Sequence, residues 1–301
     1  MLFLADPTAA ADVCLADVVL EHLLSEDAPY GDLTTRTLGI GDCPGRIILT
    51  ARGALVTCGL EEAARMFRLR GATVVAVQRS GLAVPAGTAL LEAEGSAGAL
   101  HLVWKVAQTL VEALSGIATA TRAIVAAARA VNPTIQVACT RKNFPGAKAL
   151  AIKAICAGGA VPHRLGLSES VLFFPEHRVF LPDEPLSAAR IRSLKIACPE
   201  KKIVAEATTF AEALALAEAG VDVLQVEKFS PDAVREVVRA VGDAGWPVLV
   251  AAAGGVNAGN AAAYAAAGAG LLVTSAPYFA PPTDVKVTLV PRTDDGAKGP
   301  S

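Results

Sequence analysis

Charged, glycine and hydroxyl residues follow a series of short apolar segments in the second half of the chain. They are Thr140-Arg141-Lys142, Glu206, Glu227-Lys228, Gly254-Gly255 and Thr274-Ser275. If the apolar segments are parallel strands of an α/β barrel, their carboxyl ends meet at one face and these residues converge there. Cations, two carboxylates and a glycine pair suit a substrate rich in phosphate and carboxylate, together with a divalent metal.

The basic pair Arg141-Lys142 has two interpretations. In isolation, adjacent basic residues most often form a solvated surface pair. Here they follow the apolar run 135–139 and precede Pro145-Gly146. An anion site is then competitive, because arginine offers a planar two-point contact and lysine a compact charge. A second basic pair, His163-Arg164, indicates by itself only a structural or surface role.

Glu206 and Glu227 each end an apolar segment and lie just before a predicted helix. They could be carboxylates of the kind that the helix dipole favours at a helix start. Their place at strand ends equally predicts ligands for Mg²⁺, or charges that face a developing carbocation.

Gly254-Gly255 precedes another predicted helix, and could be only a tight turn. Backbone N–H groups at such a position also form a phosphate cradle. Thr274-Ser275, at the end of the next strand, could add hydroxyl donors to the same phosphate.

Strand and helix alternate over residues 202–274. Apolar strands are predicted at 202–206, 221–226, 247–252 and 271–274. The intervening helices start at Thr209 with a capping box to Glu212, at Ser230 before a proline, and at Asn257. Apolar strands covered by amphipathic helices indicate a parallel sheet, closed as a barrel or doubly wound. The polar residues at the strand ends favour the barrel.

The first hundred residues have a different pattern. Helices are predicted at 15–24 and 61–69, and short extended runs at 46–50, 73–77 and 88–94. This pattern is typical of an α+β domain around a small antiparallel sheet. A long helical segment, 102–131, makes the transition to the strand–helix repeats.

Composition restricts the partners and the compartment. The 301 residues are 53% hydrophobic and carry a net charge of −2, which argues against nucleic acid as a main partner. Six scattered cysteines form no zinc-type spacing and indicate a reducing compartment. The N-terminus lacks a basic segment before its apolar residues, and the apolar stretch 251–276 contains Asn257 and Asn260. We therefore expect a cytoplasmic protein without a membrane span.

Several motifs together resemble the quinolinate phosphoribosyltransferase family over about residues 15–290. They are Glu26-Asp27 to Gly31-Asp32-Leu33-Thr34, Leu114-Ser115-Gly116-Ile117-Ala118-Thr119, Thr140 to Gly146, Gly158-Gly159, His163-Arg164 with Gly166 to Glu169, His177, and Gly254-Gly255. The set as a whole is specific, although no single motif is.

The resemblance implies an N-terminal α/β sandwich domain, residues 1–115 with 277–301 returning, and an open, TIM-like α/β barrel over 116–276, of the type II phosphoribosyltransferase kind. It also implies a homodimer with shared active sites. The implied pentosyltransferase reaction displaces pyrophosphate from phosphoribosyl pyrophosphate with a pyridine nitrogen, aided by Mg²⁺.

Roles follow from the resemblance for the matching positions. Arg141, Lys142, His163 and Arg164 would bind substrate anions. Glu206 and Glu227 would serve the ribose, the metal and the cationic transition state, with Lys142 as a further catalytic residue. Gly254, Gly255, Thr274 and Ser275 would hold the 5′-phosphate.

Departures from the family pattern concern the acceptor. Lys105 stands where the family usually has an arginine that reaches the neighbouring subunit's site, and Phe174 stands where it has the lysine that grips the pyridine dicarboxylate. Pro162 and Glu227 replace an asparagine and an aspartate. Loss of the ammonium removes a contact of roughly 1.5–3 kcal/mol. These departures resemble the ModD branch, paralogues named for molybdenum-transport operons and described as pyrophosphorylases.

The leading hypothesis is Mg²⁺-dependent phosphoribosyl transfer to a small aromatic or heterocyclic acid with fewer carboxylates than quinolinate. The resemblance to the ModD branch suggests a molybdenum-transport context. A quinolinate phosphoribosyltransferase of NAD biosynthesis requires Lys148 or Lys153 to replace the missing ammonium, and we expect both on the outside of the helix after Gly146. A non-catalytic ligand-binding or regulatory protein linked to oxyanion uptake is a further alternative. A Schiff-base lyase would use Lys142 or Lys202.

Overall fold

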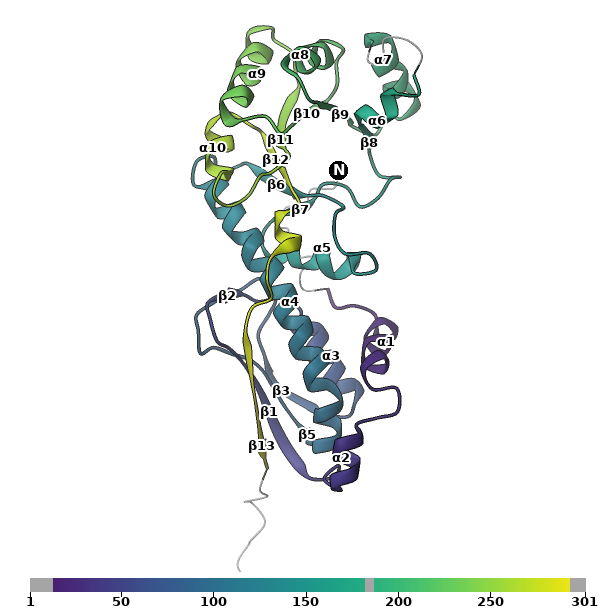
Figure 1. The fold of residues 1–301 in the computed structure, drawn as a ribbon, viewed down its shortest axis with the longest axis vertical. Helices are drawn as coiled ribbons and strands as arrows, with labels where there is room; N and C mark the ends of the chain where they lie inside the picture. Colours follow the sequence, from purple (N-terminus) through teal and green to yellow (C-terminus); the bar gives the residue numbers. More distant parts are fainter. Residues whose placement is uncertain (1–12, 182–186, 293–301) are drawn as a thin grey trace, which may run out of the picture. The chain divides into compact units, whose positions relative to one another are not determined.

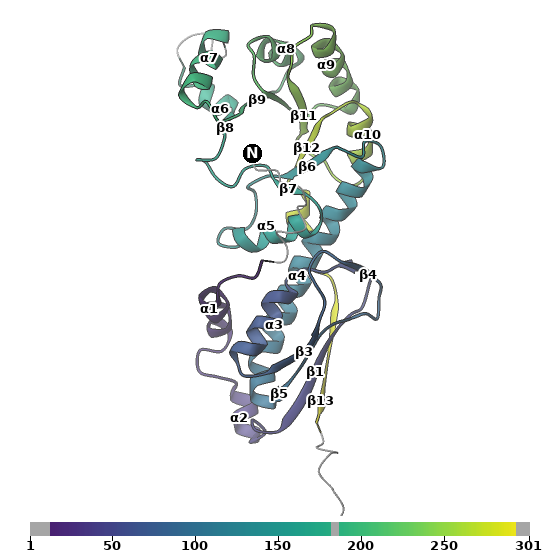
Figure 2. The same cartoon turned by 180° about the vertical axis from the view of Figure 1, so that it is seen from behind.

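The computed structural model describes residues 13–181 and 187–292 and divides into two compact units (Figures 1 and 2). Of these residues, 120–148 and 159–279 form the barrel unit, and 13–119, 149–158 and 280–292 form the sandwich unit. From its sequence, 149–158 was expected in the barrel domain. It clusters instead with the sandwich unit, because Ala154 and Ala157 pack with Val56, Cys58 and Leu114.

The barrel unit contains a parallel sheet of seven strands in the order β7-β6-β12-β11-β10-β9-β8. The strands are β6 (Gln136–Cys139), β7 (Val161–Pro162), β8 (Val171–Phe173), β9 (Ile203–Ala207), β10 (Val223–Glu227), β11 (Leu249–Ala253) and β12 (Leu271–Thr274). The sheet is an open barrel with β7 and β8 at its edges, which confirms the predicted α/β fold class.

Helices α6 (Pro175–Arg178), α7 (Ala188–Ala197), α8 (Phe210–Glu218), α9 (Pro231–Asp243) and α10 (Ala261–Ala266) connect successive strands, and the 3-10 helix η2 (Ala276–Phe279) follows β12. Figures 1 and 2 show α8, α9 and α10 along the outer side of the strands. Helix α9 buries Val234, Val237 and Val241, so its apolar face is directed inward, as its periodicity predicts.

Helix caps agree with the sequence in two of three cases. The Ser230 side chain accepts from the N–H of Ala233, and the Thr209 side chain from that of Glu212. The prediction that Asn257 caps a helix is wrong: α10 begins after Asn260, and Asn257 Oδ1 accepts from the N–H of Gly259. Asparagine stabilises a local turn by the same contact that it offers to a helix start, so the sequence does not separate the two.

The sandwich unit contains an antiparallel sheet in the order β13-β1-β5-β3 and a second pair, β2-β4. The strands are β1 (Pro44–Ala51), β2 (Leu55–Val56), β3 (Thr73–Val77), β4 (Ala83–Val84), β5 (Ala89–Ser96) and β13 (Val285–Pro291). The helices are α1 (Asp17–Asp27), α2 (Leu33–Leu38), α3 (Leu60–Leu69), α5 (Lys148–Ala157) and α4 (Ala97–Arg129), of which residues 120–129 belong to the barrel unit. Alternate residues of β1 are buried, so one face of the sheet packs on the helices (Figures 1 and 2).

Helix α4 is long and apolar enough to cross a membrane by length and composition alone. Leu100, Val103, Ala107 and Val111 of this helix are nevertheless fully buried in the sandwich core. Its apolar face is therefore already satisfied by protein, as in a core helix, and no membrane span is indicated.

Candidate functional site

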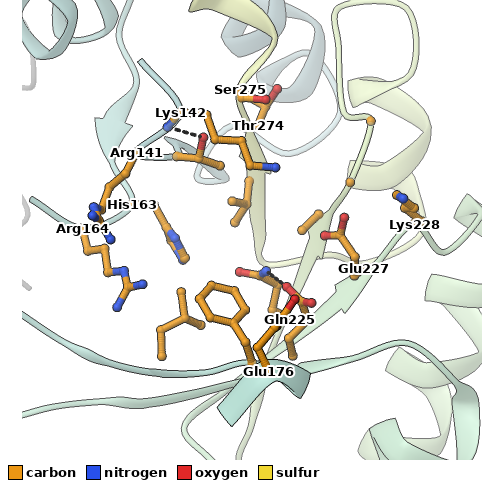
Figure 3. A pocket seen from close by; sticks show the side chains of 18 residues that line it. Arg141, Lys142, His163, Arg164, Glu176, Gln225, Glu227, Lys228, Thr274 and Ser275 are labelled. Carbon is orange, nitrogen blue, oxygen red and sulfur yellow. Dashed lines mark hydrogen bonds between the residues drawn. The ribbon is translucent and has the colours of Figure 1, made fainter. Parts of the chain in front are cut away.

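The carboxyl ends of the barrel strands surround a cavity of about 780 Å³ (Figure 3). Predicted site residues that line it are Arg141, Lys142, His163, Arg164, Phe174, Glu206, Glu227, Gly254, Gly255, Thr274 and Ser275. Its volume lies in the usual range of small-molecule sites. The strand ends therefore bring together the residue types that the sequence predicted to meet.

Lys105 is the predicted substrate-binding residue that does not line this cavity. It lies on α4 in the sandwich unit and lines a different cavity there, with Asp32 and His101. Its Nζ donates to Gln108 Oε1 at 3.0 Å and lies 4.1 Å from the centre of the Trp104 ring.

The loops after β6 and β7 supply the cationic side chains. The N–H of Lys142 donates to Thr140 Oγ1 at 3.2 Å, and the N–H of His163 donates to the Cys139 carbonyl at 2.8 Å. The first contact fixes the turn after β6, and the second holds the end of β7 to that of its neighbour β6. Figure 3 shows Arg141, His163 and Arg164 gathered on one side of the cavity.

Burial and mutual repulsion change the protonation of this cationic group. Desolvation, and then the charge of Arg164, lowers the pKa of His163 to about 4. Desolvation, and then the charge of Arg141, lowers the pKa of Arg164. His163 is therefore neutral at pH 7 and can accept or donate a hydrogen bond, while the guanidinium groups of Arg141 and Arg164 attract an anion.

Adjacent strands β9 and β10 supply the acidic side. Gln225 is the register partner of Glu206, and its Nε2 donates to Glu206 Oε2 at 2.8 Å. Burial, and then the charge of Glu227, raises the pKa of Glu206. Arg178 donates to the backbone carbonyl of Glu206 and, at 3.0 Å, to Glu212, and so fixes the end of β9.

The loop Gly254-Gly255 requires glycine at both positions, since φ is +82° and +95°. A Cβ on Gly254 would lie 2.6 Å from Glu227 Oε1, so the loop passes directly beside that carboxylate. Gly255 has open space around its α-carbon. The loop thus exposes backbone to the cavity, as a phosphate cradle would require.

Thr274 has a different use from the one the sequence suggested. Its hydroxyl donates to the Val256 carbonyl at 2.6 Å and accepts from the N–H of Ala276 at 3.0 Å. The side chain is 3% exposed. Thr274 therefore holds the glycine loop in place, and its hydroxyl hydrogen is not available to a phosphate while this bond persists. Ser275 stays a candidate donor.

Phe174 lies just after β8 and forms an aromatic cluster. Its ring stacks on that of His177 with centres 5.8 Å apart, and the guanidinium of Arg164 lies 5.7 Å from the ring centre. His177 Nδ1 accepts from the N–H of Phe174 at 3.0 Å. An apolar, cation-facing surface thus occupies the position where the family has an ammonium.

Two polar residues that the sequence did not assign to the cavity, Glu176 and Gln225, also line it, and Lys228 lines it as its place after Glu227 predicts. Gln225 is a polar residue within an otherwise apolar strand, a signal that the sequence does contain. Lys228 has φ +61° and is the non-glycine residue with positive φ in the described part of the chain. Such backbone strain concentrates at functional sites.

The lysines of the alternative hypotheses lie elsewhere. The expectation that Lys153 is on the outside of its helix is wrong: it is 4% exposed and its Nζ donates to Glu62 at 2.7 and 2.8 Å, with Glu61 at 3.0 Å. Lys148 is exposed, as expected. Lys202 is 70% exposed and 4.0 Å from Asp222, and it does not line the cavity.

The donor chemistry of the acidic side fits a hard cation. Within residues 13–181 and 187–292, no group of three His, Cys, Asp or Glu side chains forms a metal cluster. Magnesium nevertheless uses one or two carboxylates, with substrate phosphates and water completing its shell. Burial raises the pKa of Glu206, and the negative charge of Glu227 raises it further, so a bound cation would relieve the repulsion between the two carboxylates.

Comparisons with known proteins identify the family of the chain. The family model of the quinolinate phosphoribosyl transferase C-terminal domain matches residues 117–288, and that of the N-terminal domain matches 32–115. A relative from Rhodobacter capsulatus, named "Putative pyrophosphorylase ModD", is 51% identical over 82% of this chain and 94% of its own. A protein of the same name from Escherichia coli is 38% identical over 93% of this chain and 98% of its own.

A solved structure shares the fold. The nicotinate-nucleotide pyrophosphorylase of Francisella tularensis superposes with a TM-score of 0.81 over 94% of this chain and 97% of that one. Its sequence identity is 20%, so it supports the fold alone.

Proposed function

The chain belongs to the quinolinate phosphoribosyl transferase family and is a phosphoribosyltransferase, and we propose that its acceptor is a small aromatic or heterocyclic acid with fewer carboxylates than quinolinate. The observation that carries the proposal is a cavity with an intact cationic and acidic set, in which Phe174 replaces the acceptor-binding ammonium. Neither candidate replacement of the quinolinate alternative lines the cavity, since Lys153 is buried against Glu62 and Lys148 is exposed elsewhere.

The reaction transfers the phosphoribosyl group from phosphoribosyl pyrophosphate. The lone pair of an acceptor nitrogen forms a bond to C1 of the ribose, while the bond from C1 to the pyrophosphate oxygen breaks and pyrophosphate leaves with that electron pair. Glu206 and Glu227 face the positive charge that develops on the ribose. Arg141 and Lys142 bind and orient the anionic groups, and the Gly254-Gly255 loop holds the 5′-phosphate.

Mg²⁺ is proposed as the cofactor, held by Glu206 and Glu227. When bound, it would neutralise charge on the leaving pyrophosphate. The two carboxylates are adjacent on neighbouring strands, and the pKa of Glu206 is raised in part by Glu227. We expect Mg²⁺ to bind more tightly in the presence of phosphoribosyl pyrophosphate than alone, since the substrate supplies further oxygen ligands.

The oligomer and the compartment are also proposals. A homodimer with shared sites would give Lys105 a role in the site of the neighbouring copy, since it does not line the cavity of its own barrel unit. A cytoplasmic location is supported by Cys14 and Cys43, which are exposed thiols. A molybdenum-transport context is proposed from the resemblance to the ModD branch, whose name these relatives carry.

Calorimetry with phosphoribosyl pyrophosphate and Mg²⁺, followed by pyrophosphate release over a panel of pyridine and purine acids, tests the proposal. We expect binding of the donor, and turnover with a monocarboxylate in preference to quinolinate. Glu206→Gln should reduce turnover by about a hundredfold or more, whereas Glu236→Gln on the exposed face of α9 should not change it. Absence of donor binding in the wild type would refute the proposal.

A further inference from the structure

The side chain of Gln225 is 5% exposed, and its Oε1 is buried without a hydrogen-bond partner. Its Nε2 donates to Glu206 Oε2 at 2.8 Å. Because a carboxylate only accepts, this bond fixes the amide with its nitrogen on Glu206 and its oxygen directed elsewhere. Buried carbonyl groups are nearly always paired in native proteins, so an oriented exception that lines a cavity calls for a ligand as its partner.

The surroundings of Gln225 define what kind of ligand group can approach. Figure 3 shows Gln225 beside Glu176, and on the opposite side of the cavity from Lys142. The charge of Glu176 contributes to raising the pKa of Glu206, so negative potential is concentrated on this side. Phe174 and Leu172 also line the cavity and supply apolar surface. This side therefore disfavours a second carboxylate and favours a hydrogen-bond donor.

The other side of the same cavity has the opposite preference. Arg141 and Arg164 are close enough for the charge of one to lower the pKa of the other. Both line the cavity. A ligand that bridges the two sides has an anionic group at one end and an N–H or O–H donor at the other.

We propose that Gln225 is a specificity-determining residue whose Oε1 accepts a hydrogen bond from an amino, ring N–H or hydroxyl group on a monocarboxylate heterocyclic acceptor. This inference rests on the proposed phosphoribosyl transfer and names the acceptor class for the same site. Because the oxygen is shielded from solvent, water competes poorly for it, and an acceptor that lacks the donor leaves it unpaired. Access to the buried oxygen requires a neighbouring side chain of the cavity wall to move.

Matched ligands test the donor requirement without any mutation. Calorimetry is performed on the full chain with Mg²⁺ and phosphoribosyl pyrophosphate, using nicotinic acid, 2- and 6-aminonicotinic acid, 6-(dimethylamino)nicotinic acid and quinolinic acid. At least one aminonicotinic acid should bind about tenfold more tightly than nicotinic acid, and the dimethylated compound should lose that gain. Tightest binding of quinolinic acid, or equal binding of the amino and dimethylamino compounds, overturns the proposal.

Variants then assign the effect to one residue. Gln225→Met, which preserves length, should abolish the preference for the amino group. Gln136→Met is the matched control, because Gln136 at the start of β6 also has a buried, unpartnered Oε1 but does not line the cavity. If Gln225→Met instead weakens the binding of phosphoribosyl pyrophosphate or Mg²⁺ and leaves the acceptor ranking unchanged, the oxygen serves the ribose or the metal and the proposal fails.

The test also separates this inference from the proposed function. Normal donor binding and pyrophosphate release with an unexpected acceptor ranking would refute the role of Gln225 alone. Absence of donor binding in the wild type would refute phosphoribosyl transfer as such.

Discussion

The substitution Phe174→Lys tests whether this one side chain accounts for the proposed preference against quinolinate. An ammonium that contacts a ligand carboxylate contributes about 1.5–3 kcal/mol. The substitution also removes the ring that Arg164 faces at 5.7 Å, a contact worth about 0.5–1 kcal/mol, and places a like charge near that guanidinium. A net gain of about 1–2 kcal/mol remains, which corresponds to about a five- to thirtyfold rise in kcat/KM for quinolinate.

The assay is pyrophosphate release with quinolinate as the varied substrate. Phe174→Met controls for loss of the aromatic ring, and should give no gain. Phe180→Lys adds the same charge at a residue that is 86% exposed, and should also give none. Robust quinolinate turnover by the wild type that Phe174→Lys leaves unchanged would refute the reasoning, as would an equal gain from Phe180→Lys.

Three further predictions concern stability and the glycine loop. Glu62→Gln leaves the ammonium of the buried Lys153 with Glu61 at 3.0 Å and the Val13 carbonyl at 3.0 Å, and removes the carboxylate at 2.7 Å. The free energy of unfolding should therefore fall by about 2–4 kcal/mol in urea titrations, and an unchanged midpoint would contradict this. Gly254→Ala should weaken the binding of phosphoribosyl pyrophosphate about tenfold or more in calorimetry, because the new Cβ would meet the Glu227 carboxylate. Gly255→Ala should weaken this binding less, because Gly255 has open space around it. Equal effects of the two substitutions would argue against a steric cause. Burial lowers the pKa of His163 to about 4 in the folded protein, whereas its value in the unfolded chain is near 6.5. The unfolded chain therefore binds the proton more readily. As the pH falls from about 6.5 to 4, the free energy of unfolding should decrease by up to about 3 kcal/mol. His163→Gln should flatten that part of the urea midpoint against pH, and an unchanged slope would exclude His163 as the cause.

The strands and their polar ends could be predicted because they depend on local pattern. The strand predicted at 271–274 matches β12, and the extended run 73–77 matches β3. Ser230 caps α9 as predicted, since serine before proline satisfies the first turn without help from distant residues. Asn257 was misassigned because its side chain forms a turn with Gly259, an equally local alternative.

Contacts between distant segments account for the features that local pattern missed. Lys153 is followed and preceded by apolar residues and has no acidic partner on its own helix; its partners Glu61 and Glu62 are more than ninety positions away. Thr274 likewise has its partner in another segment, because its hydroxyl donates a hydrogen bond to the Val256 carbonyl. No periodicity in either segment records these pairings.

The sequence by itself determined the family, the parallel arrangement of strands and the residue types at their ends, because motif spacing and apolar periodicity are properties of short segments. Only the tertiary structure decided which of those residues lie on the acidic side of the cavity and which lie on the cationic side. Parallel strands in register place Gln225 beside Glu206. The hydrogen bond between them orients the amide of Gln225 and leaves its oxygen without a partner. Both residues lie on the acidic side of the cavity, opposite Arg141 and Lys142. Charge, burial and hydrogen-bond satisfaction depend on such neighbours in space, and these properties carry the proposal for the acceptor.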